Sequence, residues 1–550
     1  MSGNGRMDNL FPSQLKEWLK GKLQRSLTPV VMPTKQGPEY DDVFKEVPQF
    51  GRYQLCLYLG TTLLIIPMGL QFALLVFAAG TPKFHCADAN STCIPNKCCD
   101  NCTRYSFDGP FTSTVSEWDL ICDRAHLGAT SQAMFLVGML VGSLLSGIMS
   151  DAFGRRLCML ISCFIMIVCS AASSFADCLS LFALLRFGVG FSVTGLMLTQ
   201  YVYVLELVGP TKRTAAGKVT DFFWVIGACA TCLLGYLIRD WRILLLVGSL
   251  PAVVFFFFWK VFPETARWLV AKGNLVDAQV ILEKCADGRA VDSRSLQTLL
   301  QDIYEEQQRQ EKTTRRYTPL DMIKTPKLRR RTIIVCFNWF VVSIIYFGFV
   351  LYITSLSGDV YINFLLMSII DVFNTPISWF LLQKIGRRLT HCSIMLTGGL
   401  ICVLVLVVPK EYTSVVTGIA IMGKFCDTAA FSTIYLYTSE LYPTVIRNTA
   451  MGTASMFARI GGIIAPYIVM LAQLPSVSIT LPIVIFGVCS LAAGVMSLWL
   501  PETLRTTMQQ TIEETEMTPE DYGIPCCGCL GAWRTEDVIV NNDEEHETKM

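Results

Sequence analysis

Two charged side chains interrupt long apolar stretches of this 550-residue chain. Asp371 lies within INFLLMSIIDVFNTPISWFLL, and Arg459 lies within NTAMGTASMFARIGGIIAPYIVMLA. A charge near the centre of a bilayer costs several kcal/mol, so such a side chain faces a cavity or a partner. Opposite charges in two separate stretches therefore indicate a binding site for a small molecule that carries both charges.

The stretches that must position these side chains are membrane-spanning helices. The chain is 52% hydrophobic and only 16% charged, which is the composition of a membrane protein. Apolar runs of about 20 residues, each long enough to cross the hydrocarbon core, recur along the chain. We count twelve of them, at 54–80, 126–149, 156–176, 179–204, 214–238, 242–262, 332–354, 360–383, 392–409, 413–438, 447–471 and 476–500. The sequence therefore predicts an all-α membrane protein.

The charges of the loops predict the orientation. Lys- and Arg-rich segments follow the second, fourth, sixth, eighth and tenth spans, and the opposite loops carry far fewer. Because positively charged loops stay on the inner side, we expect both termini in the cytosol. Residues 1–50 are polar, so we expect a cytosolic segment without a cleavable signal peptide. Residues 263–331 predict a cytosolic helical loop, and the acidic residues 501–550 predict a disordered tail.

The loop 81–125 is expected outside and is rich in cysteine. Six cysteines in an oxidising compartment predict up to three disulfides, and the sequence leaves their pairing open. A metal knuckle is the alternative, but no histidine pattern supports it, and we expect no metal. The cysteines are Cys86, Cys93, Cys98, Cys99, Cys102 and Cys122, and glycosylation sequons begin at Asn90 and Asn101. Cys526, Cys527 and Cys529 in the tail are either palmitoylated or free thiols.

Three landmarks recur in the same order at an offset of roughly 235 residues. SDAFGRRL after the second span matches LQKIGRRL after the eighth, and ELVGPTKRT after the fourth matches ELYPTVIRN after the tenth. FPETARW after the sixth span matches LPETLRT after the twelfth. The repeat predicts two six-helix halves, 51–262 and 332–500, related by an axis along the membrane normal.

The charged residues of these landmarks all fall at the cytosolic membrane face. There they predict ion pairs between neighbouring helices, and such a cluster would clamp the cytosolic side shut until the halves rock. The alternative is solvated charge that only sets the topology. The predicted gate residues are Asp151, Arg155, Arg156, Glu206, Arg213, Glu264, Arg387, Arg388, Glu440, Arg447 and Glu502.

These motifs resemble those of solute carrier family 22, the organic ion transporters of the major facilitator superfamily. The matching segments are STVSEWDLICD (113–123), GIMSDAFGRR (147–156), ELVGPTKRTAAG (206–217), FPETARWL (262–269) and TSELYPTVIRN (438–448). The resemblance covers residues 40 to 505 and implies the major facilitator fold, two pseudo-symmetric six-helix bundles around a central substrate cavity. Ala152 and Gln383 depart from the family's pattern, so we expect the ion-pair cluster to be weaker or asymmetric.

The same resemblance gives a substrate class. Arg459 lies where the anion and carnitine branches of the family carry a cation, whereas the Lys that the anion branch carries one turn after Asp371 is replaced by Thr375. One fixed cation and one fixed anion predict a zwitterion such as carnitine, with its carboxylate on Arg459 and its ammonium on Asp371. The alternative is a structural polar core, in which both charges pair with each other or with Asp427 and Lys424.

A quaternary ammonium cannot donate a hydrogen bond, so we expect aromatic rings beside it. The family's span-seven pattern makes Tyr346 the first choice among these rings. The candidate substrate-binding residues are Arg459, Asp371, Tyr346, Trp339, Trp224, Gln200, Asp427 and Lys424. Lys218 and Asp221 belong either to the cavity or to the gate.

Several classes of function are excluded. The sequence contains no recognisable nucleotide-binding loop or catalytic triad, so we expect no enzymatic activity, ATP-driven pumping, cofactor or nucleic-acid partner. We expect a multi-pass plasma-membrane protein that carries carnitine-like zwitterions and organic cations as a secondary transporter. The alternatives are an organic anion exchanger that uses Arg459 and a non-transporting receptor or scaffold with the same fold. The sequence identifies no coupling ion.

Overall fold

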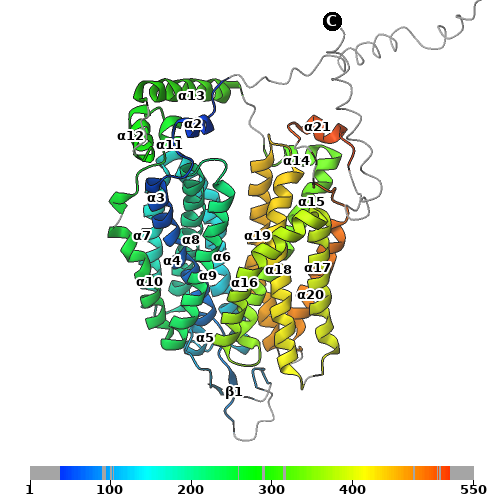
Figure 1. The fold of residues 1–550 in the computed structure, drawn as a ribbon. Coiled ribbons are helices and arrows are strands. Elements are labelled where there is room, and N and C mark those ends of the chain that lie inside the picture. The colour runs from blue at the N-terminus through cyan, green and yellow to red at the C-terminus, as the bar shows by residue number, and fades with distance from the viewer. Residues whose placement is uncertain are drawn as a thin grey trace, which may run out of the picture.

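The structure, a computed structural model, consists mainly of long helices in two bundles (Figure 1). It describes residues 37–88, 95–99, 102, 104–257, 259–287, 292–313, 318–409, 411–474, 477–504, 506 and 509–520. The predicted glycosylation sites Asn90 and Asn101, together with Cys93 and the tail cysteines, lie outside these residues.

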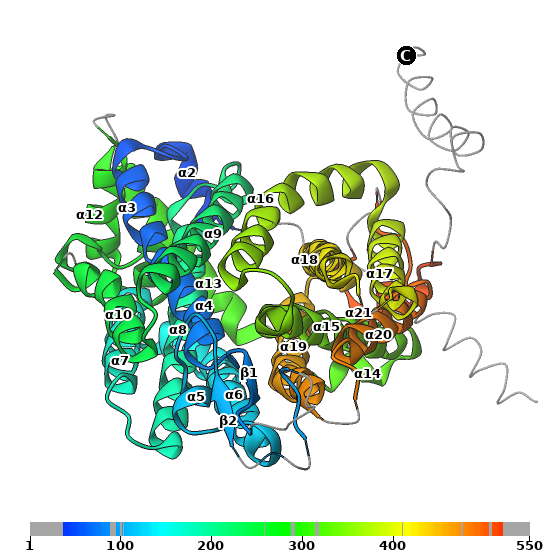
Figure 2. The same cartoon turned by 90° about the horizontal axis from the view of Figure 1, so that it is seen from below.

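The membrane-spanning helices divide into a first and a second half, which stand side by side when viewed from below (Figure 2). The first half contains α3 (Arg52–Leu63), α4 (Ile65–Ala78), α6 (Ala125–Phe153), α7 (Arg155–Ser173), α8 (Leu179–Leu207), α9 (Arg213–Leu237) and α10 (Trp241–Phe257). The second half contains α15 (Pro326–Tyr352), α16 (Val360–Ile385), α17 (Arg387–Val403), α18 (Thr413–Leu441), α19 (Arg447–Met470) and α20 (Leu481–Ser497).

These helices account for the apolar runs of the sequence. Within the described residues, ten spans are long and apolar enough to cross a membrane, the first being α3 and α4 together as Arg52–Ala78. The shorter apolar helices α10 and α20 occupy the sixth and twelfth predicted positions. Each half therefore supplies six spans, as the sequence repeat predicts.

The two ends of the bundles differ. Short helices lie at one end, here called the cap face, which carries α11 (Ala266–Ala271), α12 (Leu275–Cys285) and α13 (Ser293–Thr313) (Figure 1). The opposite end, here called the loop face, carries the cysteine-rich segment with α5 (Thr114–Glu117) and the paired strands β1 (Phe84–Cys86) and β2 (Tyr105–Phe107).

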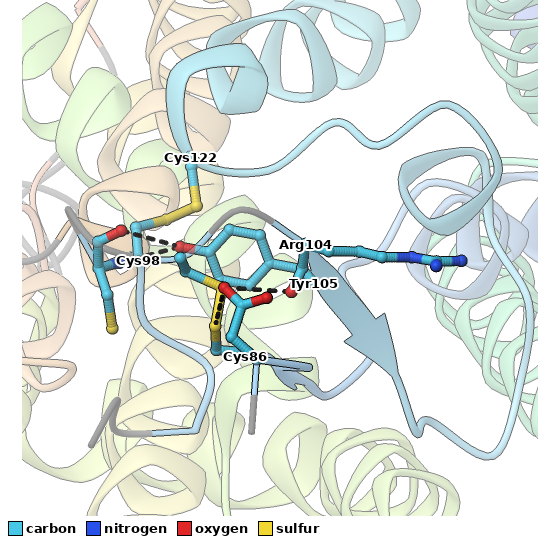
Figure 3. Close-up of a disulfide and its surroundings, with 8 residues drawn as sticks. Cys86, Cys98, Arg104, Tyr105 and Cys122 are labelled. Atoms are coloured by element: carbon cyan, nitrogen blue, oxygen red, sulfur yellow. Dashed lines mark hydrogen bonds between the residues drawn. A yellow bond between two sulfur atoms is a disulfide. The ribbon is translucent and has the colours of Figure 1, made fainter. Parts of the chain in front are cut away.

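Disulfides tie the cysteine-rich segment together. Cys86 bonds to Cys102, joining the edge of the two-stranded sheet to the chain before β2, and Cys98 bonds to Cys122, directly before α6 (Figure 3). Cys99 is also disulfide-bonded, and its backbone N–H donates to the Tyr105 hydroxyl at 2.9 Å. Because Cys86 and Cys102 are bonded to each other, neither offers a thiolate to a metal.

Hydrogen bonds join the two halves at the loop face. The Gln473 side chain donates to Thr81 at 3.0 Å, and the hydroxyls of Thr130 and Tyr467 are 3.1 Å apart. Phe77 of α4 packs against Tyr361 of α16, with ring centroids 5.4 Å apart. The halves are therefore held together at the end where the cysteine-rich segment lies.

Each half also binds a terminal segment at the cap face. Residues before α3, including η1 (Tyr40–Asp42) and α2 (Val43–Glu46), pack into one apolar cluster with α11–α13. Asp41 accepts two hydrogen bonds from the Arg213 guanidinium, at 2.6 and 2.9 Å. These bonds lower the pKa of Asp41 below its ordinary value, so this contact persists at neutral pH.

The acidic tail differs from the prediction of disorder over residues 509–520. It forms α21 (Ile512–Met517) on the second half, close to α14 (Asp321–Lys324) and α15. The Glu516 carboxylate accepts from the backbone N–H of Lys327 at 3.0 Å, and Glu520 pairs with Arg331 at 3.0 Å. Composition alone did not reveal this contact because the basic partners lie about 190 residues earlier in the chain.

The repeated Gly-Arg-Arg motifs form the sharp turns between α6 and α7 and between α16 and α17. Gly154 and Gly386 adopt φ values of 98° and 99°, which favour glycine because it has no Cβ. An added Cβ would also lie 2.3 Å from the Glu264 carboxylate at Gly154 and 2.7 Å from the Glu502 carboxylate at Gly386. Each carboxylate accepts the first two backbone N–H groups of the next helix. Glycine thus makes room for the cap of that helix.

We predict that Gly386→Ala destabilises the protein more than Gly358→Ala does. Both glycines have a positive φ, so both variants carry the backbone strain of roughly 1–2 kcal/mol. Only at Gly386 must the methyl group displace Glu502, whose charge-assisted hydrogen bonds contribute roughly 1.5–3 kcal/mol each. The measurement is the thermal midpoint of each variant in detergent, and equal midpoints would contradict the role given to Glu502.

Candidate functional site

A cavity lies between the two halves. The space inside it amounts to about 440 Å³, a volume that includes the part open to solvent at its mouth. The first half contributes α4 and α9, and the second half contributes α15, α16 and α18. The lining residues are Phe72, Ala73, Trp224, Val225, Ala228, Tyr346, Val350, Phe364, Met367, Ser368, Asp371 and Lys424.

An ion pair lies in the wall of this cavity. The Lys424 ammonium donates to both carboxylate oxygens of Asp371, at 2.6 and 2.5 Å, and to the backbone carbonyl of Met367 at 2.9 Å. The Lys424 side chain is only 3% exposed and that of Asp371 17%. All three donors of the ammonium are therefore directed at α16.

The sequence contains the signal that brings these two residues together. Asp371 is 11 residues beyond Val360, where α16 begins, and Lys424 is 11 residues beyond Thr413, where α18 begins. Both helices start at the loop face, so both side chains lie roughly 16 Å along their helices. Equal depth in the membrane makes an ion pair between the two residues possible. The pair forms because α16 packs against α18, which the sequence does not show.

Aromatic rings surround the ion pair. Phe72 and Trp224 of the first half have ring centroids 5.3 Å apart, and Phe364 lies on the wall beside Asp371. The Lys424 ammonium lies over the ring of Tyr346, and its nitrogen is 5.5 Å from the ring centroid. The Tyr346 hydroxyl is close enough to the Trp224 indole for a hydrogen bond. The cavity can thus offer aromatic faces to a cationic group in addition to the carboxylate.

Two other candidate residues lie outside the lining. Trp339 is 1% exposed, donates its indole N–H to Thr438 at 2.9 Å and packs against Tyr435 in the second half. Gln200 is equally buried, within the first half. Sequence analysis placed both residues in spanning helices correctly but could not tell which face of each helix turns to the cavity.

Arg459 also lies outside the lining, on α19. It interacts electrostatically with Tyr435 of α18. Within the described part of the chain, its buried Nε has no hydrogen-bond partner. The structure pairs Asp371 with Lys424, which is one of the alternatives that the sequence left open, and it does not place Arg459 in the same cavity lining as predicted.

Most of the predicted gate residues form one network in each half, whereas Arg213 pairs with Asp41. Arg155 pairs with Glu206 at 3.0 Å, and the Thr265 hydroxyl donates to the same carboxylate at 2.6 Å. In the second half Arg387 pairs with Glu440 at 3.0 Å, and Thr503 donates to it at 2.6 Å. These bonds connect the cap-face ends of helices of the same half, so each network stiffens its own bundle.

The two networks are not identical. Asp151 adds an ion pair of 3.0 Å to Arg155, whereas the second half has Gln383 in its place. Burial raises the pKa of Glu264, although the backbone N–H groups of Thr265, Arg156 and Arg155 act against that rise. In the second half, Arg388 N–H donates to Glu502 and Arg447 is the first residue of α19.

Comparisons with known proteins agree with this arrangement. A family model described as "Sugar (and other) transporter" matches residues 101–514. An organic cation transporter protein of Drosophila melanogaster is 32% identical over 520 residues, covering 87% of this chain and 94% of that protein. Human solute carrier family 22 member 13 is 33% identical over 407 residues, covering 74% of this chain and 72% of that protein. The chain belongs to solute carrier family 22 of the major facilitator superfamily.

A solved structure supports the fold of this family member. The E. coli xylose transporter XylE in an inward-open conformation superposes with a TM-score of 0.61 at 16% identity, covering 84% of this chain and 99% of that one. The predictions of family, of the major facilitator fold and of a membrane transporter that is not an enzyme are confirmed.

We predict strong energetic coupling between Asp371 and Lys424. Removing one partner of a buried ion pair leaves the other charge unpaired and costs roughly 3–5 kcal/mol, whereas removing both costs much less than the sum. Asp371→Asn, Lys424→Met and the double variant form the cycle, and the thermal midpoint in detergent is the measurement.

The matched control is the pair of Lys218 and Asp221 on α9. Their charged atoms are 3.6 Å apart, and both side chains are more than half exposed. An exposed pair contributes roughly 0–1 kcal/mol, so the same cycle there is expected to be nearly additive. Additive behaviour at Asp371 and Lys424 as well would show that their pairing is not important for the fold.

Proposed function

We propose that this chain is a secondary transporter of small organic ions that prefers zwitterions with a quaternary ammonium group and a carboxylate, such as carnitine. The observation that carries the proposal is the ion pair of Asp371 and Lys424, which lies in the cavity wall among aromatic rings. A family whose members include an organic cation transporter of Drosophila melanogaster supports the substrate class.

Partner exchange explains why a zwitterion fits best. When its ammonium moves beside Asp371, with Phe72, Trp224 or Tyr346 against its methyl groups, Lys424 loses its partner. The carboxylate of the same molecule then becomes the partner of Lys424. Every buried charge stays paired, whereas a plain cation deprives Lys424 of its partner Asp371 and a plain anion deprives Asp371 of its partner Lys424. Aromatic contacts add roughly 0.5–2 kcal/mol each.

Alternating access follows from the two rigid halves. The contacts between Gln473 and Thr81 and between Thr130 and Tyr467 hold the halves together at the loop face. The separate networks around Glu206 and Glu440 keep each bundle intact while the halves rock. The positively charged loops and the disulfides support a cytosolic cap face and an external loop face in the plasma membrane.

A second candidate function is the exchange of organic anions at Arg459. Its guanidinium is partly buried near the middle of α19, and its Nε has no partner among the described residues. A guanidinium nitrogen in a spanning helix that lacks a partner among the described residues favours an anionic ligand. In this case the substrate would bind at Arg459, outside the wall that holds Asp371.

Uptake measurements test the proposal directly. Cells that express the chain are given labelled carnitine, tetraethylammonium as a cation and glutarate as an anion. We expect the highest specific uptake for carnitine and lower uptake for tetraethylammonium. Uptake of glutarate alone would favour anion exchange, and uptake of none of the three would favour the receptor or scaffold.

We predict that Lys424→Met lowers the ratio of carnitine uptake to tetraethylammonium uptake by at least tenfold. The carboxylate of carnitine loses a charge-assisted contact of roughly 1.5–3 kcal/mol, and a plain cation gains an unpaired Asp371. Arg459→Ala is the comparison, because it removes a cation outside the cavity wall. A larger fall in the ratio for Arg459→Ala than for Lys424→Met would move the carboxylate site to Arg459.

We predict that the loop face lies outside the cell. A short epitope inserted after Asp108, between β2 and α5, should bind antibody on intact cells, whereas an epitope between α12 and α13 should bind only after permeabilisation. The reverse pattern of antibody binding would show that the cap face, and not the loop face, lies outside the cell.

A further inference from the structure

A second buried acid lies one turn from the ion pair. Asp427 of α18 is 4% exposed, and neither of its carboxylate oxygens has a hydrogen-bond partner among the described residues. It is three residues beyond Lys424 on the same helix, a spacing that places the two Cβ atoms roughly 5–6 Å apart. The cavity wall includes Lys424 but not Asp427.

Lys424 does not neutralise Asp427 in this arrangement. Its three donors are directed at Asp371 and at the Met367 carbonyl, although the two residues of α18 are close enough to interact electrostatically. An ionised carboxylate without a donor in a spanning helix is costly, and the cost is avoided when the group carries a proton. Protonation of Asp427 removes this cost while Lys424 is bound to Asp371.

The groups around Asp427 come from each helix packed against α18. Tyr346 of α15, Asp371 of α16 and Cys402 of α17 interact with it electrostatically, as do Lys424 and Cys426 of its own helix. On α19, Arg459 instead interacts with Tyr435, eight residues further along α18. Among these described groups, Lys424 is the cation that interacts with Asp427.

We propose that Asp427 is a proton site through which the protein exchanges organic cations for protons, an inference that rests on the proposed cavity function. A cation that binds Asp371 displaces the Lys424 ammonium. The ammonium then turns to Asp427, the O–H bond of this carboxyl group breaks, and the proton leaves to water in the cavity. One positive charge enters and one leaves, so the buried site stays neutral.

Zwitterions do not require this step. The carboxylate of a zwitterion takes the place of Asp371 as the partner of Lys424, and Asp427 keeps its proton. The site therefore distinguishes two classes of substrate by their coupling: transport of a plain cation releases one proton, and transport of a zwitterion releases none.

Proton release from the purified protein tests the inference without transport. Tetraethylammonium or carnitine is added to the full-length protein in weakly buffered detergent solution, and a pH indicator counts protons per bound ligand. We expect about one proton for tetraethylammonium and none for carnitine, and Asp427→Asn should bind tetraethylammonium without releasing a proton. Glu411→Gln, which removes an exposed carboxylate just before α18, should behave like the unchanged protein.

Transport in proteoliposomes supplies the second measurement. An outward-directed proton gradient should raise tetraethylammonium uptake by the unchanged protein severalfold. The same gradient should not change tetraethylammonium uptake by Asp427→Asn. Carnitine uptake should not respond to the gradient in either protein. Cation binding without proton release, or equal release by Asp427→Asn, would overturn the proton site and leave the proposed function intact. Failure of the unchanged protein to bind or carry either substrate would overturn both.

Discussion

A charge inside a membrane protein needs a countercharge, and the ion pair of Asp371 and Lys424 shows how this chain meets that constraint. The pair lies in the wall of a cavity that both halves form, so a substrate can reach it. Because either member left alone is costly, a substrate enters most favourably when it replaces both partners at once. The proposed preference for zwitterions, the lower affinity expected for ions of one sign and the proposed role of Asp427 as a proton site are consequences of the same requirement.

The repeated landmarks at the cap face serve the rigidity of the two bundles. In each half an Arg, a Glu and the Glu of the Pro-Glu-Thr segment connect the ends of neighbouring helices, and a glycine with positive φ makes room for the carboxylate that caps the next helix. Stiff halves let a small movement at the loop-face contacts become a change of access at the other end. Asp41 and Glu516 add a terminal segment to each half, so both ends of the chain contribute to this stiffness.

The residue types and their depth along the helices could be predicted from the sequence, whereas their neighbours could not. Asp371, Lys424, Tyr346 and Trp224, four of the candidate substrate-binding residues, line the cavity. Arg459 and Trp339 lie in spanning helices, but neither side chain lines the cavity. Hydropathy gives the position of a residue along a helix. The face of the helix on which the residue lies must be inferred from the periodicity of polar and apolar residues, and nearly uniform apolar spans contain little such periodicity.

The sequence by itself determined the twelve spans, the two-fold repeat, the loop that carries disulfides and the family, because each of these follows from local composition or from motifs within a short segment. Only the tertiary structure decided which cation neutralises Asp371, that Asp427 has no donor among the described residues, and that residues 509–520 of the acidic tail fold onto α15. These features join helices that are distant in sequence, and a difference of one position in the rotation of a helix turns a side chain by about 100° and so selects another partner.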